Sequence, residues 1–334
     1  MWNMIQCAVQ GRGHISTETP CQDKTYVYCE NDTYVIALAD GAGSARLSHY
    51  GAECVTKTIC DSLIKEFDLY FSEDDGVAVK RKIIHDLWDV LEAVASEQAC
   101  EIKDLASTLL VAAVNKDRYI LIHIGDGVIG FLKDDELKVA TQPENGEFAN
   151  TTVFVTSTDV LHSMKILKGN LGAITGFVLM SDGTENSLYD KREKSLAPAV
   201  KKLMKLSWVM LKECLESEVK ECFEEVVKAA TTDDCSIAML VKEDSLFRGY
   251  NELSKAQKDK MLGFEAGELS KKRRKRYDAI LNYLVTPNTL DKVSWQIYTL
   301  KKYTKRYMER LLEQNLIVKQ NELYRTAVIL NKDT

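Results

Sequence analysis

Short apolar runs that lie beside an aspartate recur through the first two thirds of the chain, and they restrict it to folds built from buried strands. Four such runs adjoin an aspartate: Tyr34–Ala39 before Asp40, Tyr119–Ile124 before Asp126, Gly176–Met180 before Asp182, and Cys235–Val241 after Asp233-Asp234. Three more lack one: Leu109–Val114, Val128–Leu132 and Thr151–Thr156. Short apolar segments bounded by turn residues predict strands buried in a sheet.

Helical spacing occurs in pairs of segments between these runs. Apolar residues recur three and four positions apart in Tyr50–Phe67 and Lys82–Ala95, and again in Leu196–Met210 and Val219–Ala230. This spacing predicts amphipathic helices. Because groups of strands alternate with pairs of helices, the pattern favours packed sheets covered by helix pairs over a doubly wound parallel sheet.

Charge divides the chain near residue 245. Residues 245–334 hold 19 basic and 10 acidic residues, a balance of +9, whereas residues 1–244 hold 25 and 40, a balance of −15. An acidic body attracts cations, and a basic segment attracts nucleic acid or acidic partners. We therefore expect a body of residues 1–244, a helical connector of 245–270 and a basic domain of 271–334, with the body and the basic part separable.

Membrane insertion and secretion are not expected. The apolar runs are much shorter than the roughly 18 residues that a membrane span requires. The start of the chain, Met1-Trp2-Asn3-Met4, is neither basic nor apolar enough for a secretory signal. The nine cysteines include no Cys-x-x-Cys pair, and the five histidines lack ligand spacing. We expect reduced thiols, a cytoplasmic location and no zinc site.

The aspartates at the strand ends are candidate ligands of a hard cation. Asp-Gly alone is a turn signal, and Asp126-Gly127, closely flanked by strands, is typical of a hairpin turn. Asp23, Asp40, Asp126, Asp182 and Asp233 can instead converge from separate strands into one oxygen-rich site. Mg²⁺ and Mn²⁺ bind such oxygen ligands.

Six motifs occur in the order seen in the metal-dependent protein phosphatases of the 2C type, and the chain resembles that family over about residues 5–242. They are Cys21-Gln22-Asp23, Ala39-Asp40-Gly41-Ala42-Gly43, Ala106-Ser107-Thr108, Ile124-Gly125-Asp126-Gly127, Met180-Ser181-Asp182-Gly183 and Asp233-Asp234-Cys235-Ser236. Residues 11–23 are more similar to the bacterial branch. The resemblance implies an α+β fold, a four-layer α-β-β-α sandwich of two antiparallel sheets flanked by helix pairs, with a metal site at one end.

The resemblance also implies roles for four residues of that site. Asp40 would bridge two Mn²⁺ or Mg²⁺ ions, the Gly41 carbonyl would ligate one of them, and Asp182 and Asp233 would hold the other. Two such ions lower the pKa of a bridging water, and the hydroxide attacks phosphorus in line. They also neutralise the phosphoryl oxygens in the transition state.

Two further residues near the site have lesser roles by the same resemblance. Asp23 would support the metal shell, mostly through water, and Asp126 matches a position linked to a weaker third ion. This mechanism needs no covalent phospho-enzyme. We therefore interpret Cys21, the cysteine beside the site, as a small buried apolar residue rather than a nucleophile.

The chain departs from the family pattern at several positions. Gln22 stands where the family has Glu, so affinity for one metal can drop, and Asp234 stands where the family usually has Asn, which adds charge back. The family often uses an Arg shortly before its acidic pair to hold the substrate phosphate. Here His14 is our first choice for that role and Arg12 the alternative, and both are also compatible with solvated loop positions.

The basic segment 271–334 has the pattern of a winged helix-turn-helix domain. Helical spacing in Tyr277–Val285, Leu290–Ile297 and Leu300–Gln314 precedes two strand-like runs, Leu316–Val318 and Leu323–Leu330. Six consecutive basic residues, Lys271–Arg276, form either a solvated helix face or a contact to phosphates or to an acidic partner. Lys301, Lys302, Lys305 and Arg306 would suit entry into a DNA groove, although the fold alone does not decide between DNA and protein.

Three functions fit these observations. The favoured one is a Mn²⁺- or Mg²⁺-dependent phosphatase acting on phosphoserine and phosphothreonine in proteins, with an accessory C-terminal domain. A catalytically weak scaffold that binds phosphoprotein or DNA is the alternative, motivated by Gln22. Retention of Asp40, Asp182 and Asp233 opposes the scaffold, because a scaffold has no need of mutually repelling carboxylates. A hydrolase of small phosphoesters is the third.

Overall fold

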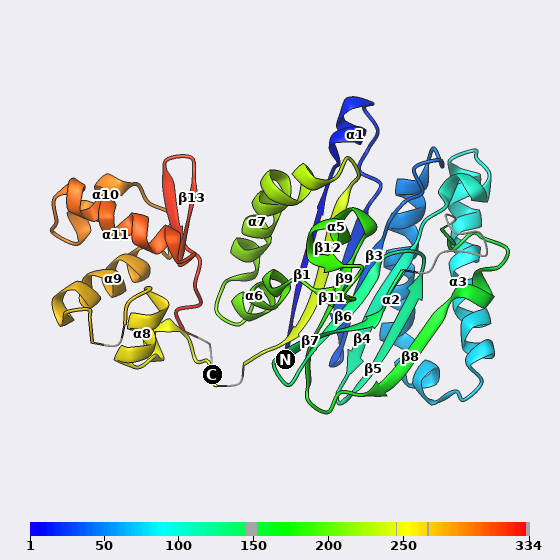
Figure 1. Cartoon of the computed structure of the whole chain (residues 1–334), viewed down its shortest axis with the longest axis horizontal. Helices are drawn as coiled ribbons and strands as arrows, with labels where there is room; N and C mark the ends of the chain where they lie inside the picture. The colour runs from blue at the N-terminus through cyan, green and yellow to red at the C-terminus, as the bar shows by residue number, and fades with distance from the viewer. Residues whose placement is uncertain (144–151, 245, 266, 332–334) are drawn as a thin grey trace. The chain divides into compact units, whose positions relative to one another are not determined.

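The computed structural model describes residues 1–143, 152–244, 246–265 and 267–331, and the chain divides into two compact units. The first unit consists of Met1–Met204 and Glu216–Lys242, and the second of Lys205–Leu215 and Glu243–Thr334. Figure 1 shows the elements of both. The last break lies near the boundary expected from charge, but the assignment of the short segment 205–215 to the second unit was not expected.

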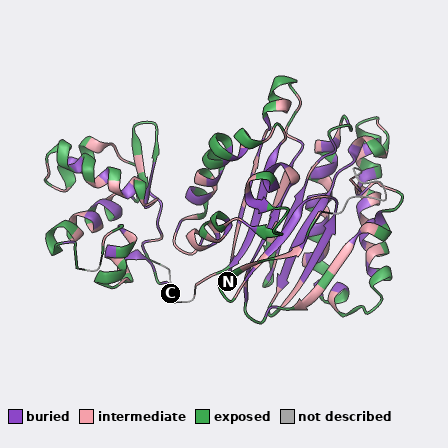
Figure 2. Ribbon diagram, viewed as in Figure 1, coloured by how far each residue is buried: buried purple, intermediate pink, exposed green. Residues whose placement is uncertain are grey.

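Two five-stranded antiparallel sheets form the centre of the first unit, as predicted (Figure 1). The first sheet has the order β1 (Trp2–Val9), β12 (Cys235–Lys242), β9 (Ile174–Met180), β6 (Val128–Lys133) and β7 (Glu136–Thr141). The second has the order β2 (Lys24–Glu30), β3 (Thr33–Ala39), β4 (Leu109–Asn115), β5 (Arg118–Ile124) and β8 (Lys165–Asn170). The strands are the most deeply buried part of this unit (Figure 2).

Alternate residues of the central strands enter two different cores. Leu38 of β3 packs between the sheets with Phe177 of β9 and Leu240 of β12. Its neighbour Ala37 enters the other core, where α2 and α3 cover the second sheet. Because both faces of β3 are covered, its sequence is a continuous apolar run instead of an alternating one.

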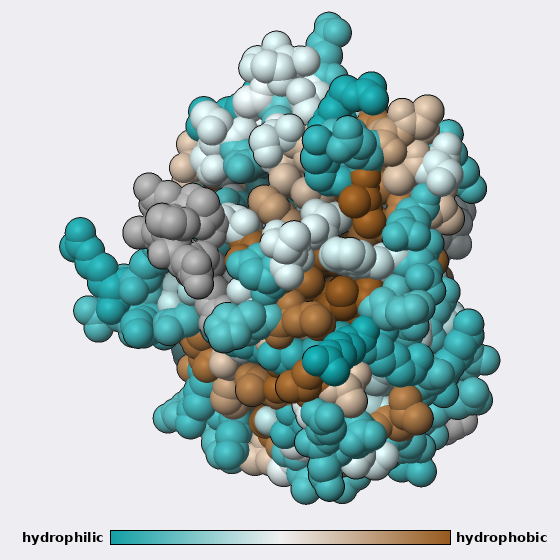
Figure 3. Space-filling model, turned by 90° about the vertical axis from the view of Figure 1, so that its right-hand side faces the viewer, coloured by the Kyte–Doolittle hydropathy of each residue, from teal (hydrophilic) through white to brown (hydrophobic). Residues whose placement is uncertain are grey.

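Helices and short turns complete the first unit, and two of these helices also have residues in the second unit, 205–206 and 212–215. They are α1 (Arg12–Ser16), α2 (Ser48–Ser72), α3 (Gly76–Glu97), the 3₁₀ turn Ile102–Leu105, α4 (Val160–Ser163), α5 (Asp182–Leu188), the short strands β10 (Tyr189–Asp190) and β11 (Ser195–Leu196), α6 (Pro198–Leu206), α7 (Lys212–Cys222), the π turn Phe223–Val227 and the 3₁₀ turn Lys228–Ala230. Figure 3 shows the side on which α2 and α3 lie, where hydrophilic side chains surround a hydrophobic patch. No helix of the described residues is both long and apolar enough to cross a membrane.

Several elements differ from the sequence prediction. Residues 152–156, within the strand predicted at Thr151–Thr156, are not a strand, and Thr151 lies outside the described residues. The strands β1, β2, β7 and β8 were not predicted. They lie at or next to sheet edges and are only partly buried, so their apolar patterns are weak.

Asp126 does not occupy a hairpin turn, which corrects the reading of Asp126-Gly127. The strand before it, β5, pairs with β4 and β8, whereas the strand after it, β6, pairs with β7 and β9 in the other sheet. The chain therefore crosses between sheets here. Gly125 has φ +110°, a conformation that side-chain-bearing residues rarely adopt, and its carbonyl bonds His123 at 2.8 Å.

The second unit contains three helices followed by a hairpin, in the order predicted. They are preceded by the 3₁₀ turn Tyr250–Glu252 and α8 (Lys255–Met261), and comprise α9 (Lys271–Tyr283), α10 (Leu290–Gln296), α11 (Lys301–Glu313), β13 (Ile317–Gln320) and β14 (Leu323–Thr326). Residues 245–270 are not a free connector, because Tyr250, Leu262 and Leu269 are buried in the core of this unit. Arg274 is bonded to the buried Asp259 at 2.6 and 2.7 Å, which fixes α8 to α9.

Backbone bonds hold the segment 205–215 within the second unit. The Leu211 amide donates to the Ala327 carbonyl at 2.7 Å, and the Ile329 amide donates to the Val209 carbonyl at 2.8 Å. Met210 also pairs with Val328 in an isolated antiparallel bridge. A chain cut after residue 244 would retain 205–215 without these partners. Truncation at this point would therefore not separate the body and the tail as two complete units.

Candidate active site

The ends of three strands bring the predicted aspartates together. Asp40 directly follows β3, Asp182 follows β9 by two residues and begins α5, and Asp233 precedes β12 by two residues. Asp40 is electrostatically coupled to Asp23, Asp182 and Asp233, and Asp182 to Asp126. The structure therefore places all five predicted carboxylates in one cluster, which we call the carboxylate cluster.

The pKa values of Asp40 and Asp182 are both raised. Burial raises the pKa of Asp40 well above its usual range, and the charges of Asp23 and Asp182 raise it further. Burial also raises the pKa of Asp182, whereas a hydrogen bond from Asp40 lowers it. The bond thus favours the protonated form of Asp40 and the ionised form of Asp182, with Asp40 as donor.

Asp23 is the most deeply buried member of the carboxylate cluster. Its residue is 1% exposed, and neither carboxylate oxygen has a hydrogen-bond partner that satisfies normal geometry. Burial raises the pKa of Asp23 to about 7. The nearby Ser236 hydroxyl has the opposite effect and lowers this pKa, but by less. A buried carboxylate with no donor costs free energy, so the site needs a proton or a cation there.

The oxygen atoms of the cluster fit a hard divalent cation. Asp23 Oδ1, Asp23 Oδ2 and Asp182 Oδ1 are all buried without a hydrogen-bond partner. Mg²⁺ and Mn²⁺ prefer such oxygen donors. The side chains are gathered but not closed around one point: within the described ranges, no three His, Cys, Asp or Glu side chains form a ready-made metal cage.

Gly41 is fixed in place by its neighbours. It forms a β-bridge with Ser107, and an added Cβ would lie 2.8 Å from Ser48 Oγ and 3.1 Å from Gln22 Cβ. Only glycine fits this space. Gln22 is itself buried, and its amide nitrogen is 3.4 Å from the Ala45 carbonyl oxygen. Its side chain therefore supports the loop after β3.

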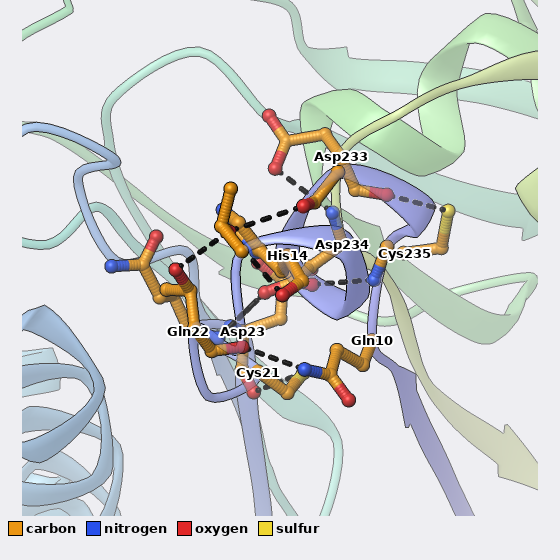
Figure 4. Close-up of polar contacts among 12 residues, drawn as sticks. Gln10, His14, Cys21, Gln22, Asp23, Asp233, Asp234 and Cys235 are labelled. Atoms are coloured by element: carbon orange, nitrogen blue, oxygen red, sulfur yellow. Dashed lines mark hydrogen bonds and ion pairs between the residues drawn. The ribbon is translucent and has the colours of Figure 1, made fainter.

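Asp234 is the residue whose role the sequence did not reveal (Figure 4). Its buried carboxylate accepts from the backbone amides of Gly11 at 2.6 Å and Gln22 at 2.5 Å, and its Oδ1 lies 2.9 Å from His14 Nδ1. Its charge is thus committed to the loop of residues 11–22, which corrects the reading that it simply restores charge to the metal site. A second acidic residue beside Asp233 was the only available signal.

The two candidate phosphate ligands are held by the protein itself. His14 faces Asp234, and the exposed Arg12 donates from Nη2 to the carbonyls of Ala229 at 3.1 Å and Thr231 at 3.0 Å. The Gly13 amide donates to the Thr232 carbonyl at 2.8 Å. These contacts hold α1 against the segment before β12. The side chain of Arg12 therefore stabilises this part of the fold.

Two further residues near the cluster were not predicted. Thr152 donates its hydroxyl to Asp126 Oδ2 at 2.5 Å. Lys191 forms an ion pair with the buried Glu185 and is electrostatically coupled to Asp182 and Asp126. Lys191 is therefore a cation close to the carboxylate cluster. No sequence pattern indicated this role, because a Lys-Arg pair in a polar loop is typical of solvated surface.

The cysteines beside the cluster are in the thiol form. Burial raises the pKa of Cys21 well above its usual range, and the nearby charge of Asp234 adds to this effect. Burial likewise raises the pKa of Cys235 to about 12. Because the thiolate is the nucleophile, neither residue is suited to covalent catalysis.

We expect Asp234→Ala to lower the free energy of unfolding by about 2–4 kcal/mol, because it leaves buried amides of the 11–22 loop without an acceptor. Asp234→Asn, which keeps one acceptor oxygen, should lose less than half of that. Urea unfolding of the two variants measures the difference. An Asp234→Ala variant as stable as the wild type would contradict the role given to this carboxylate.

We expect ionisation of Asp23 to lower the free energy of unfolding of the metal-free protein. With a pKa of about 7 in the folded state and about 4 when unfolded, the folded form binds the proton more tightly. The stabilisation that comes from this bound proton is therefore fully present below pH 4, and it is lost as the pH rises to about 7. Asp23→Asn should gain stability over the wild type across this range, by roughly 4 kcal/mol at most. Unfolding in EDTA at several pH values checks this, and a pH-independent difference would contradict it.

A large part of the chain is similar to known proteins. Residues 10–222 match the family described as Protein phosphatase 2C. The chain is 24% identical over 264 residues to serine/threonine-protein phosphatase 3 of Escherichia coli (strain K12), covering 71% of this chain and 97% of that protein.

Solved structures of bacterial phosphatases share the fold. One bacterial serine phosphatase superposes with a TM-score of 0.53 at 17% identity, over 74% of this chain and 100% of that one. Serine/threonine phosphatase Stp1 from Staphylococcus aureus superposes with a TM-score of 0.51 at 18% identity, over 73% and 96%. The chain belongs to the protein phosphatase 2C family, which confirms the resemblance predicted from its six motifs.

Proposed function

We propose that this protein is a Mn²⁺- or Mg²⁺-dependent phosphatase that removes phosphate from serine and threonine residues of proteins. One observation carries the proposal: a member of the protein phosphatase 2C family holds a cluster of buried and half-buried aspartates, in which oxygens of Asp23 and Asp182 are buried without a hydrogen-bond partner. The names of the E. coli and S. aureus relatives support the choice of substrate residues.

We assign the residues of the cluster as follows. Asp40, the Gly41 carbonyl, Asp182 and Asp233 would hold two ions, with Asp40 contributing to both. Asp23 supports the metal shell from its buried position, and Asp126 is placed for a weaker third ion. The buried oxygens of Asp23 and Asp182 that lack a hydrogen-bond partner support this assignment, because a cation would satisfy them.

The bound ions would supply an activated water and neutralise the phosphoryl oxygens. The protein's own contribution is to hold the aspartates close together in a buried place, where their mutual repulsion favours cation binding. Asp234 fixes the loop of residues 11–22 beside them. His14, held by Asp234, is proposed to approach the substrate phosphate, and Arg12 remains the alternative only if it leaves its carbonyl partners.

We also propose finer features of the fold and setting. The two sheets and their helices are proposed to form the four-layer α-β-β-α sandwich of the family. The three helices and hairpin of the second unit are proposed to be a winged-helix-like domain that docks an acidic protein or DNA. A cytoplasmic location is proposed from the nine free cysteines.

A catalytically weak scaffold is the second candidate, favoured by Gln22 and by the open arrangement of the carboxylates. Turnover of p-nitrophenyl phosphate and of a phosphothreonine peptide, each with and without Mn²⁺, separates the two. Mn²⁺-dependent release of phosphate from both substrates supports the phosphatase. Release from the aryl phosphate alone favours a small-molecule hydrolase, and release from neither favours the scaffold.

A further inference from the structure

The second unit contains a pocket of about 760 Å³ with an unusual lining. Its walls carry four arginines, Arg273 and Arg276 from α9 and Arg306 and Arg310 from α11, and five aromatic side chains, Phe264, Tyr277, Tyr298, Tyr303 and Tyr307. The same two helices carry six lysines, none of which lines the described pocket. The cationic lining of the pocket thus consists of arginines and not lysines. Guanidinium groups bind phosphate and carboxylate through two parallel hydrogen bonds.

Aromatic rings hold these arginines in position. The guanidinium carbons of Arg310 and Arg273 lie 4.7 and 5.3 Å from the centre of the Phe264 ring. Arg276 lies over the Tyr307 ring and donates from Nη1 to the Tyr307 hydroxyl at 3.2 Å. Cation–π contacts of this kind fix long side chains before a ligand arrives, which reduces the entropy lost on binding.

Most of the positive charge in the pocket is not neutralised by the protein. Arg310 pairs with Glu313 at 3.2 Å. Arg273, Arg276 and Arg306 have no carboxylate within ion-pair distance among the described residues. A bound anion would neutralise the charge of these three arginines.

The pocket fits one concentrated anionic group better than a long polyanion. Glu309 and Glu313 line it beside the arginines and would repel a nucleic-acid backbone that continued past them. At the pocket, Tyr298 and Leu300 are 89% and 67% exposed and offer apolar surface to residues next to the anion. A phosphorylated side chain with apolar neighbours matches both features.

We propose that this pocket binds a phosphorylated segment of a protein substrate and so recruits it to the enzyme. The choice of a phosphoprotein rests on the proposed function. Residues 1–244 carry a charge balance of −15 and would repel such substrates, whereas residues 245–334 carry +9. A separate cationic pocket supplies the attraction that the acidic catalytic unit lacks.

Peptide binding to the full-length Asp40→Asn variant tests the proposal, since this variant should not consume its ligand. The probe is a fluorescein-labelled peptide with one phosphothreonine flanked by leucines, and the readout is fluorescence anisotropy. We expect it to bind at least about tenfold more tightly than the same peptide without phosphate. Adding Arg273→Gln and Arg306→Gln should weaken binding by about tenfold or more.

Matched variants separate the pocket from general charge. Lys275→Gln with Lys301→Gln removes the same charge from the same two helices outside the pocket, and binding should stay within about twofold. Arg273→Lys with Arg306→Lys keeps the charge but not the two-pronged geometry, and should bind at an intermediate level. Equal losses in the lysine and arginine variants would overturn the proposal.

Two further outcomes are informative. Oligothymidine that displaces the peptide at lower concentration, and depends on the same arginines, would show a nucleic-acid site and overturn the proposal. Turnover of p-nitrophenyl phosphate by the wild type is measured in parallel. Intact turnover without phosphopeptide binding refutes the pocket alone, whereas binding without turnover refutes only the proposed catalytic function.

Discussion

Asp40→Asn is expected to reduce turnover by at least about a hundredfold while the fold survives. Asp40 lies at the end of β3, where the charges of Asp23, Asp182 and Asp233 act on it. As the proposed bridging ligand, it would contact both ions, so the loss of its charge weakens both at once. The measurement is kcat on p-nitrophenyl phosphate across a range of Mn²⁺ concentrations.

The same variant should be no less stable than the wild type in EDTA. It removes one of several buried carboxylates that repel one another, and an amide needs no counter-charge. Asp61→Asn, at an exposed position of α2, is the matched control and should leave both activity and stability unchanged. Turnover of Asp40→Asn near the wild-type value at saturating Mn²⁺ would remove Asp40 from the site.

EDTA is expected to abolish turnover, and added Mn²⁺ or Mg²⁺ to restore it. The proposed nucleophile is a metal-activated water, so no activity should remain without the ions. The ions should also raise the melting temperature, because they bind the folded carboxylate cluster and not the unfolded chain. Phosphate release and thermal unfolding, each in EDTA and after metal addition, provide the two measurements.

Thiol alkylation is the control for this experiment. Burial keeps Cys21 and Cys235 protonated, so iodoacetamide should react at the exposed Cys29 and Cys222 without loss of turnover. Substantial activity in EDTA would refute the metal mechanism. Inactivation in step with modification of Cys21 would instead indicate a thiol nucleophile.

The sequence predicted the strands that are buried on both faces and missed those at sheet edges. β3, β4 and β9 are continuous apolar runs because they lie between a second sheet and a covering layer. β2 and β8 are exposed enough to carry polar residues such as Lys24 and Lys168, so their patterns were too weak to recognise. The central strands therefore led to the right class of fold without a complete sheet.

The predicted carboxylates gather as expected, but their supports could not be predicted. The Asp-Gly motifs pointed to Asp40, Asp126 and Asp182, because a cation site requires several carboxylates and these three recur beside predicted strands. The bond from Gly11 to Asp234 joins residues 223 positions apart, and no local pattern indicates such a contact. The hairpin turn considered as the alternative for Asp126-Gly127 was wrong, because spacing alone cannot show that the flanking strands belong to different sheets.

The connectivity of the second unit bears on how such a protein can arise and be rebuilt. The chain passes between the units three times, after Met204, Leu215 and Lys242. A domain fused at a terminus can be gained, lost or exchanged in one recombination event. Here that event would leave 205–215 behind without the strand partners at 327–329, so a working chimaera requires the insertion and the C-terminal extension to be transferred together.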